Sequence, residues 1–183
     1  MFIHELTAPD YPHGKLRLIK PSLEYTALSL RWLSDTEVGQ YMGADFSDVS
    51  IATEEQRIRD ILSGNDTIGW MIELNGEVIG AIELNGIKES SEEYFTKAGN
   101  FSILIGDKTN WGKRIAHYTK QAVINWAFGE GGFELLIGKA LANNERSWRS
   151  FEHLGFEFRG IKPDTLSGHP VEWRLYTLTK PHR

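Results

Sequence analysis

The residues most suited to binding a charged ligand lie in one loop, which contains Gly112, Lys113 and Arg114. Alternating polar and apolar residues predict a strand at 100–105 before this loop, and a helical apolar spacing predicts a helix at 114–128 after it. A helix that begins directly after such a loop presents unpaired backbone N–H groups at the positive end of its dipole. Phosphate groups bind at such helix ends, and the two basic side chains add formal charge. The loop is therefore a candidate site for the pyrophosphate of a nucleotide cofactor.

Several alternative chemistries are excluded by what the sequence lacks. Neither the P-loop pattern GxxxxGKS/T nor the dinucleotide fingerprint GxGxxG occurs. The chain contains no cysteine, which excludes disulfides, thiolate metal sites and a cysteine nucleophile. We therefore expect no metal centre, and a reaction that needs no cysteine-linked intermediate.

Two separate motifs resemble those of a known family. The first is the run I-G-D-x4-W-G-K-x-I-A at 105–116, and the second is N-E-R-S-W-R-S-F-E-H-L-G-F at 144–156. In order and spacing they resemble the GNAT acetyltransferases, most of all the RimJ/RimL-like ribosomal-protein N-acetyltransferases, from about Gly69 to the C-terminus. The resemblance implies an α/β (α+β) fold with a mixed, mostly antiparallel central sheet whose middle strands splay apart, flanked by helices. It also implies an N-acetyltransferase that uses acetyl-CoA as co-substrate and a primary amine as direct nucleophile.

The resemblance further implies where the cofactor lies. The acyl-pantetheine would lie between two splayed strands, 101–105 and 133–141, and backbone groups of the first strand would pair with its amides. The family's pyrophosphate loop falls on 111–116. The cofactor-binding residues implied in this way are Ile103, Leu104, Ile105, Trp111, Gly112, Lys113, Arg114, Ile115, Ala116, Asn144 and Ser147.

Three positions depart from the family's pattern. Trp111 stands where the family has Gln or Arg, and Arg114 stands where it has a central glycine. Arg114 either grips a phosphate or crowds the loop, because a glycine there lets phosphate oxygens approach the backbone. Phe151 stands where many members have a tyrosine that protonates the departing thiolate. The resemblance then assigns that acid role to Ser147, whose alternative role is a first-turn serine bonded to the backbone.

Acyl transfer to an amine also needs a base, because the free alkylamine, with a pKa near ~10, is protonated at neutral pH. Glu83, on a predicted strand, and Asp164, in the predicted turn region 162–170, are the two principal catalytic candidates. Asp107 and Glu172 are further candidates, and a water chain could replace all of them. Each acid has the alternative role of a solvated surface carboxylate.

The hydrophobic periodicity of the whole chain predicts strands and helices in the order β-α-α-β-β-β-α-β-α-β-β. The pair Asn75-Gly76 between two apolar stretches predicts a type I′ hairpin. Residues 87–98 and 162–170 are predicted as loop and turn. No linker or composition shift divides the chain, so we expect a single domain over 1–183.

The composition of the chain limits the kinds of molecule that it can be expected to bind. The 183 residues carry a formal net charge of -5, which disfavours nucleic acid and suits a cationic amine. No signal-peptide pattern or membrane-spanning run occurs, so we expect a cytoplasmic protein without membrane contact, as a monomer or homodimer. The acceptor stays open among a small-molecule amine, an amino sugar and a protein N-terminus. Loops around it would contribute acidic and aromatic side chains, namely Asp45, Phe46, Asp48, Glu89, Glu92, Glu93 and Tyr94.

Two functional hypotheses follow. The first is an active N-acetyltransferase. The alternative, motivated by Arg114 and by the missing tyrosine at 151, is a catalytically weak or inactive GNAT-like sensor domain that binds acyl-CoA.

Overall fold

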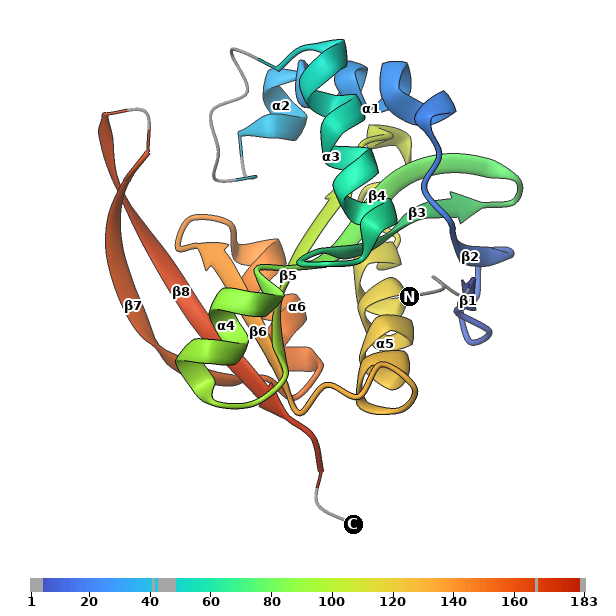
Figure 1. The fold of residues 1–183 in the computed structure, drawn as a ribbon. Coiled ribbons are helices and arrows are strands. Elements are labelled where there is room, and N and C mark those ends of the chain that lie inside the picture. The colour runs from blue at the N-terminus through green and yellow to red at the C-terminus, as the bar shows by residue number, and fades with distance from the viewer. Residues whose placement is uncertain (1–4, 41, 43–48, 167, 182–183) are drawn as a thin grey trace.

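The computed structural model describes residues 5–40, 42, 49–166 and 168–181, so the predicted acceptor residues Asp45, Phe46 and Asp48 lie outside the described residues. In the described part eight strands form one sheet in the order β1-β2-β3-β4-β5-β6-β8-β7 (Figure 1). Neighbouring strands are antiparallel except β5 and β6, which are parallel. The mixed, mostly antiparallel sheet is therefore confirmed. The strands are β1 (Leu6–Thr7), β2 (Leu16–Ile19), β3 (Ile68–Leu74), β4 (Glu77–Asn85), β5 (Ala98–Ile105), β6 (Leu135–Leu141), β7 (Glu157–Leu166) and β8 (His169–Thr179).

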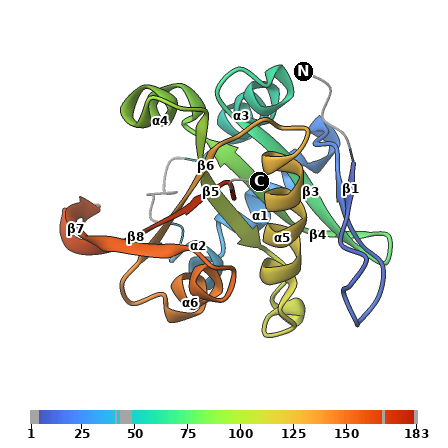
Figure 2. The same ribbon diagram turned by 90° about the horizontal axis from the view of Figure 1, so that it is seen from below.

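Helices cover both faces of the sheet. The helical elements are η1 (Leu23–Tyr25), α1 (Thr26–Leu33), α2 (Thr36–Gly39), α3 (Ile51–Ser63), α4 (Ile87–Tyr94), η2 (Lys108–Asn110), α5 (Ile115–Phe128) and α6 (Glu145–His153). Figures 1 and 2 show α1 and α3 on one face and α5 and α6 on the other. On the α5 face Trp70 meets Trp126 edge to face, with ring centroids 5.0 Å apart. On the opposite face Trp32 of α1 packs with Ile19 and Met71. The apolar periodicity of each element thus buries one side against the sheet.

The hairpin between β3 and β4 has the predicted turn. Asn75 and Gly76 both have positive φ angles, 53° and 91°. Positive φ at both central residues defines type I′, whose twist matches that of the flanking strands. The prediction from the Asn-Gly pair is confirmed.

The middle of the sheet opens into a fork between β5 and β6. The two strands pair only from Ala98, opposite Leu135, to Phe101, opposite Gly138. Beyond this point β5 continues against β4, and β6 continues against β8. Gly138 stands at the branch, where a Cβ atom would come within 2.7 Å of the Phe151 ring, so only glycine lets α6 approach so closely. The splayed middle strands are confirmed.

Two predicted loops have regular structure instead. The prediction of a loop at 87–98 is wrong, because α4 covers its first part and packs on β5, where Asn100 Nδ2 donates to Ser90 Oγ at 2.7 Å. The prediction of a turn at 162–170 is also wrong, because β7 and β8 pair as far as Leu166 and His169. Pro163 is tolerated in β7 because that strand forms the edge of the sheet, where a missing N–H costs no ladder hydrogen bond.

The described residues contain neither a membrane-spanning helix nor a cluster of metal-binding side chains. Within 5–40, 42, 49–166 and 168–181, no helix combines the length and apolar character needed to cross a bilayer. Across the same part of the chain, no group of three or more His, Cys, Asp or Glu side chains is arranged to hold a metal ion.

Candidate functional site

A cavity of about 830 Å³ lies where the fork opens. Its walls come from β5, the loop that leads into α5, the end of β6 and the first turns of α6. The structure brings together ten of the eleven residues predicted to bind the cofactor. These are Ile103, Leu104, Ile105, Trp111, Gly112, Arg114, Ile115, Ala116, Asn144 and Ser147.

The wall formed by β5 presents backbone groups. From Ser102 to Ile105 this strand has β4 on one side and the cavity on the other, because β6 has turned away. The indole Nε1 of Trp111 donates to the Ile105 carbonyl at 2.8 Å and so ties the loop to the end of the strand. The segment 102–104 is therefore the part of the open strand edge that an amide-containing chain can join by strand addition.

The amino end of α5 faces the same cavity. Arg114 is its N-cap, with φ 58° and ψ 19°, and no side chain caps the helix there. This left-handed conformation favours glycine and costs a non-glycine residue about 1 kcal/mol or more. The Arg114 guanidinium lies over the Tyr118 ring, 5.9 Å from its centroid. The side chain thus extends along α5, and the helix end keeps its electropositive character toward the cavity.

Sequence reasoning missed a cluster of basic residues on the helices. Arg146 and Arg149 of α6 line the cavity together with His117 of α5, and the Arg146 guanidinium lies 5.8 Å from the Trp111 ring. Burial lowers the pKa of His117, and the neighbouring positive charges, led by Arg114, lower it further. The spacing of Arg146 and Arg149, three residues apart on one helix, was the signal that could have found them. Such a surface suits the phosphates of a nucleotide.

The second motif begins at the amino end of α6. Asn144 is the N-cap, and its Oδ1 accepts from the backbone N–H of Ser147 at 3.3 Å. The Asn144 side chain therefore caps the amino end of α6. Asn144 and Ser147 both line the cavity.

Glu83 lies one strand away from the cavity. It is opposite Ser102 in the β4–β5 pairing, and its side chain is 14% exposed. The Arg57 guanidinium donates to Glu83 and also, through Nε and Nη2, to both oxygens of Glu54 at 2.8 and 2.7 Å. Burial raises the pKa of Glu83 and Glu54 adds to the effect, while Arg57 opposes it. A buried carboxyl with a raised pKa is suited to proton transfer near neutral pH.

Asp164 lies farther from the chemistry. It stands in β7 and not in a loop, it is exposed, and it accepts a hydrogen bond from Trp173 Nε1 at 3.2 Å. Trp173 lines the cavity, and Lys139 Nζ lies 4.2 Å from the centroid of its ring. Asp164 is therefore not part of the cavity wall, and its link to the cavity is the hydrogen bond that it accepts from Trp173. The other two acids lie elsewhere: Asp107 caps η2, and Glu172 is exposed on β8.

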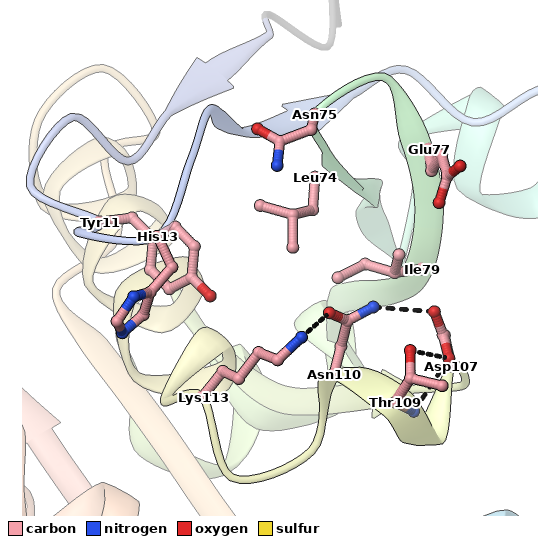
Figure 3. A pocket seen from close by; sticks show the side chains of 10 residues that line it. All are labelled: Tyr11, His13, Leu74, Asn75, Glu77, Ile79, Asp107, Thr109, Asn110 and Lys113. Carbon is pink, nitrogen blue, oxygen red and sulfur yellow. Dashed lines mark hydrogen bonds between the residues drawn. The ribbon is translucent and has the colours of Figure 1, made fainter.

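Lys113 is the one predicted cofactor residue that does not line the fork cavity. Its Nζ donates to Asn110 Oδ1 at 2.8 Å, in a second cavity of about 570 Å³ (Figure 3). Asn110 Nδ2 in turn donates to Asp107 Oδ2 at 2.8 Å. Tyr11 and His13 lie on the other side of Lys113 in this view. The Lys113 side chain turns away from the fork cavity because Asn110 accepts a hydrogen bond from its ammonium group. Asp107 in turn holds the Asn110 amide in place.

Comparison with known protein families decides the identity of the fold. The family model described as an acetyltransferase (GNAT) domain matches residues 15–157. The chain belongs to the GNAT acetyltransferase family. The resemblance inferred from the two motifs is thereby confirmed, and it extends nearer the N-terminus than those motifs indicated.

Individual relatives are distant in sequence. An uncharacterised protein of Methanocaldococcus jannaschii is 28% identical over 116 residues, which cover 61% of this chain and 21% of the relative. The chain thus spans about a fifth of the length of that curated relative. Among solved structures, RimL, a ribosomal L7/L12 α-N-protein acetyltransferase in complex with coenzyme A, has a TM-score of 0.77 at 15% identity, covering 92% of this chain and 97% of its own. A spermidine N-acetyltransferase from Vibrio cholerae, in complex with CoA and spermine, has a TM-score of 0.79 at 15% identity, covering 90% and 95%.

Proposed function

We propose that this protein is an N-acetyltransferase that moves an acetyl group from acetyl-CoA to a primary amine by direct attack. The observation that carries the proposal is the fork, whose open β5 edge runs toward the uncapped amino end of α5 within one cavity. Strand edge and helix end offer the two kinds of contact that an amide-containing chain joined to a pyrophosphate needs. The family match and the CoA-bound relatives of similar fold support it.

In the proposed complex the pantetheine amides pair with β5 around Ile103 and Leu104, and the pyrophosphate lies at 112–116. Arg146 and Arg149 supply positive charge for the phosphate groups. Lys113 contributes its backbone and not its ammonium group, because that group is held by Asn110.

The proposed reaction has two proton transfers. The neutral amine attacks the thioester carbon, and β5 backbone N–H groups stabilise the oxyanion that forms. Glu83 accepts the proton that the amine loses, either directly or through water, and its raised pKa favours this role. When the C–S bond breaks, Ser147 protonates the sulfur. Asp164 stays the alternative base.

Binding of the co-substrate is tested first. Thermal unfolding with saturating acetyl-CoA should show a clear increase in Tm, because a ligand at 100 times its Kd stabilises the folded state by about 2.7 kcal/mol. Desulfo-CoA, which keeps the pyrophosphate and the pantetheine amides, should stabilise to a similar degree. No shift with either ligand would refute the proposal.

Turnover is tested with a panel of amines. Spermidine, a peptide with an N-terminal serine, and glucosamine represent the three acceptor classes that the sequence leaves open. CoA release should be detected by a thiol reagent with at least one of them. Binding of acetyl-CoA without CoA release on any amine would favour the alternative, an acyl-CoA-binding sensor domain, which is motivated by Arg114 and by the phenylalanine at 151.

The role of Arg114 is tested by Arg114→Gly. If the guanidinium grips a phosphate, the Kd for CoA should rise about 10-fold, which corresponds to 1.4 kcal/mol. A lower Kd would show instead that the side chain obstructs the loop. Arg59→Gln, on the exposed side of α3 and outside the cavity wall, removes one positive charge as a control.

A further inference from the structure

Lys120 of α5 is a buried cation between the two helices that flank the fork. Its side chain is only 1% exposed, and it points toward α6. Its Nζ donates to Ser150 Oγ at 3.2 Å and lies 3.7 Å above the centroid of the Phe151 ring. Among the ion pairs of the described residues, none involves Lys120.

This arrangement is costly unless the charge is used. A hydroxyl and an aromatic face compensate only part of the hydration that an ammonium group loses on burial. Burial accordingly lowers the pKa of Lys120 to about 7. A leucine or methionine would fill the same space without this cost, since the rest of the buried α5 face consists largely of apolar residues such as Val123 and Ile124.

Lys120 is linked to the cavity through its hydrogen bond with Ser150. In its ammonium form Lys120 only donates, so Ser150 Oγ is then its acceptor. The single hydrogen of the Ser150 hydroxyl then remains to be donated elsewhere. Ser150 lines the fork cavity, and so does Phe151, at the position where the family's tyrosine would stand. The buried cation therefore polarises a hydroxyl donor on the wall of the proposed acyl-CoA site.

Resting on the proposed function, we infer that Lys120 is a positioning residue that stabilises the departing CoA thiolate through Ser150. When the tetrahedral intermediate collapses, the carbonyl re-forms and the C–S bond breaks with its electron pair on sulfur. Ser150 Oγ–H donates a hydrogen bond to that sulfur, and the Lys120 cation balances its charge. No proton leaves Lys120. The subsequent protonation of sulfur stays with Ser147 or solvent.

Other titratable groups lie around Lys120 and the neighbouring His117. His117 lies one turn earlier on α5, and its pKa is lowered partly by Lys120 itself. His153 of α6 also acts on His117, and the Tyr176 ring stacks against Phe151. Tyr176 donates to Glu152 Oε1 at 2.9 Å. The experiments therefore compare variants of Lys120 that keep these groups in place.

The first experiment needs no amine acceptor. The pKa of the thiol of bound CoA is measured from the ultraviolet absorbance of the thiolate in wild type, Lys120→Met, Lys120→Arg and Ser150→Ala. A cation acting on the sulfur should keep the thiol pKa in wild type below that in Lys120→Met by about one pH unit or more. Lys120→Arg, which retains the charge, should stay near wild type, and Ser150→Ala should resemble Lys120→Met. Equal values in wild type and Lys120→Met would overturn the inference.

The second experiment separates this role from a structural one. With an amine that wild type acetylates, Lys120→Met should lower kcat about 100-fold with little change in KM for acetyl-CoA. Its Tm should equal or exceed that of wild type, because the variant removes an uncompensated buried charge. An unchanged kcat would reject the role of Lys120. Failure of wild type to bind CoA in the first experiment would reject the proposed function instead, so the two failures are distinguishable.

Discussion

The two faces of the sheet bury charge in opposite ways. On the α3 face Arg57 is paired with two carboxylates, Glu54 and Glu83, and makes both oxygens of Glu54 acceptors. On the α5 face Lys120 has a single hydroxyl and a phenyl ring as partners. The carboxylates beside Arg57 offset the hydration that its cation loses, whereas the hydroxyl and ring beside Lys120 offset only part of that loss. Burial alone therefore does not distinguish a structural charge from a functional one, whereas the quality of its hydrogen-bonded and charged partners does.

The physical reason lies in hydration. Each buried ion loses several kcal/mol of hydration, which only close opposite charges with good hydrogen bonds can offset. In the Arg57 group removal of one partner leaves the others uncompensated. In the Lys120 pair removal of the cation leaves only a serine. Stability should therefore respond in opposite directions to the loss of charge on the two faces.

The largest effect is expected for Arg57→Met. This change leaves two buried carboxylates without a cation and should destabilise the fold by about 3 kcal/mol. Urea unfolding measures the difference. Arg59→Met, two residues along α3, removes only an exposed pair with Glu55 and should cost less than about 1 kcal/mol. If both variants lost the same free energy of unfolding, the ion pairs of Arg57 with Glu54 and Glu83 would contribute no more to stability than an exposed pair.

The next largest effect is expected for Glu83→Gln. The amide still accepts a hydrogen bond from Arg57 but cannot take a proton, so kcat/KM should fall about 100-fold, or 2.7 kcal/mol. In wild type the activity should decline as pH falls through the raised pKa of Glu83, since the carboxyl then becomes protonated. An unaltered pH–rate profile in the variant would remove Glu83 from the role of base.

Lys120→Met should produce a smaller effect of opposite sign to Arg57→Met. The folded-state pKa of Lys120, about 7, is below its unfolded value of about 10.4, so the unfolded chain binds more protons between these values. The stability of wild type should therefore decrease as pH falls from about 10 toward 7. At pH 7 the variant should be more stable by about 2 kcal/mol, and the difference should shrink at pH 10. Denaturant midpoints of both proteins across this range measure it, and a variant less stable than wild type at pH 7 would contradict the comparison.

The smallest effect is expected for Asp164→Asn. Asp164 is exposed and touches the cavity only through Trp173, so its loss of charge should change kcat by less than about 3-fold. The same amine assay used for Glu83→Gln measures it. A loss of kcat comparable to that of Glu83→Gln would assign the role of base to Asp164.

Local patterns predicted part of this fold well. The Asn75-Gly76 turn depends on backbone torsions that two adjacent residues set by themselves, so it was predictable. The helix α4 was missed because its residues are mostly polar, and because its packing on β5 cannot be read from the sequence. The full length of the β7–β8 hairpin was missed because Pro163 indicates a turn unless the strand is known to be an edge.

The candidate site shows the same division. The order of the two motifs predicted a CoA cavity, and ten of the eleven residues implied by it line one cavity. The direction of Lys113 could not be predicted, because it depends on Asn110 and not on its own position in the loop. Arg146 and Arg149 were overlooked among the many charged residues of the chain, although their spacing places them on one side of α6.

By itself, the sequence determined the strand–loop–helix order, the hairpin turn and the family, because these depend on residues close together in the chain. Which buried charges meet a compensating partner depends instead on contacts between residues far apart in the chain. Lys120 and Ser150 are thirty positions apart, and Arg57 and Glu83 twenty-six. Whether a buried charge meets an opposite charge, a hydroxyl or a ring depends on how distant elements pack, and that packing sets both its pKa and its use.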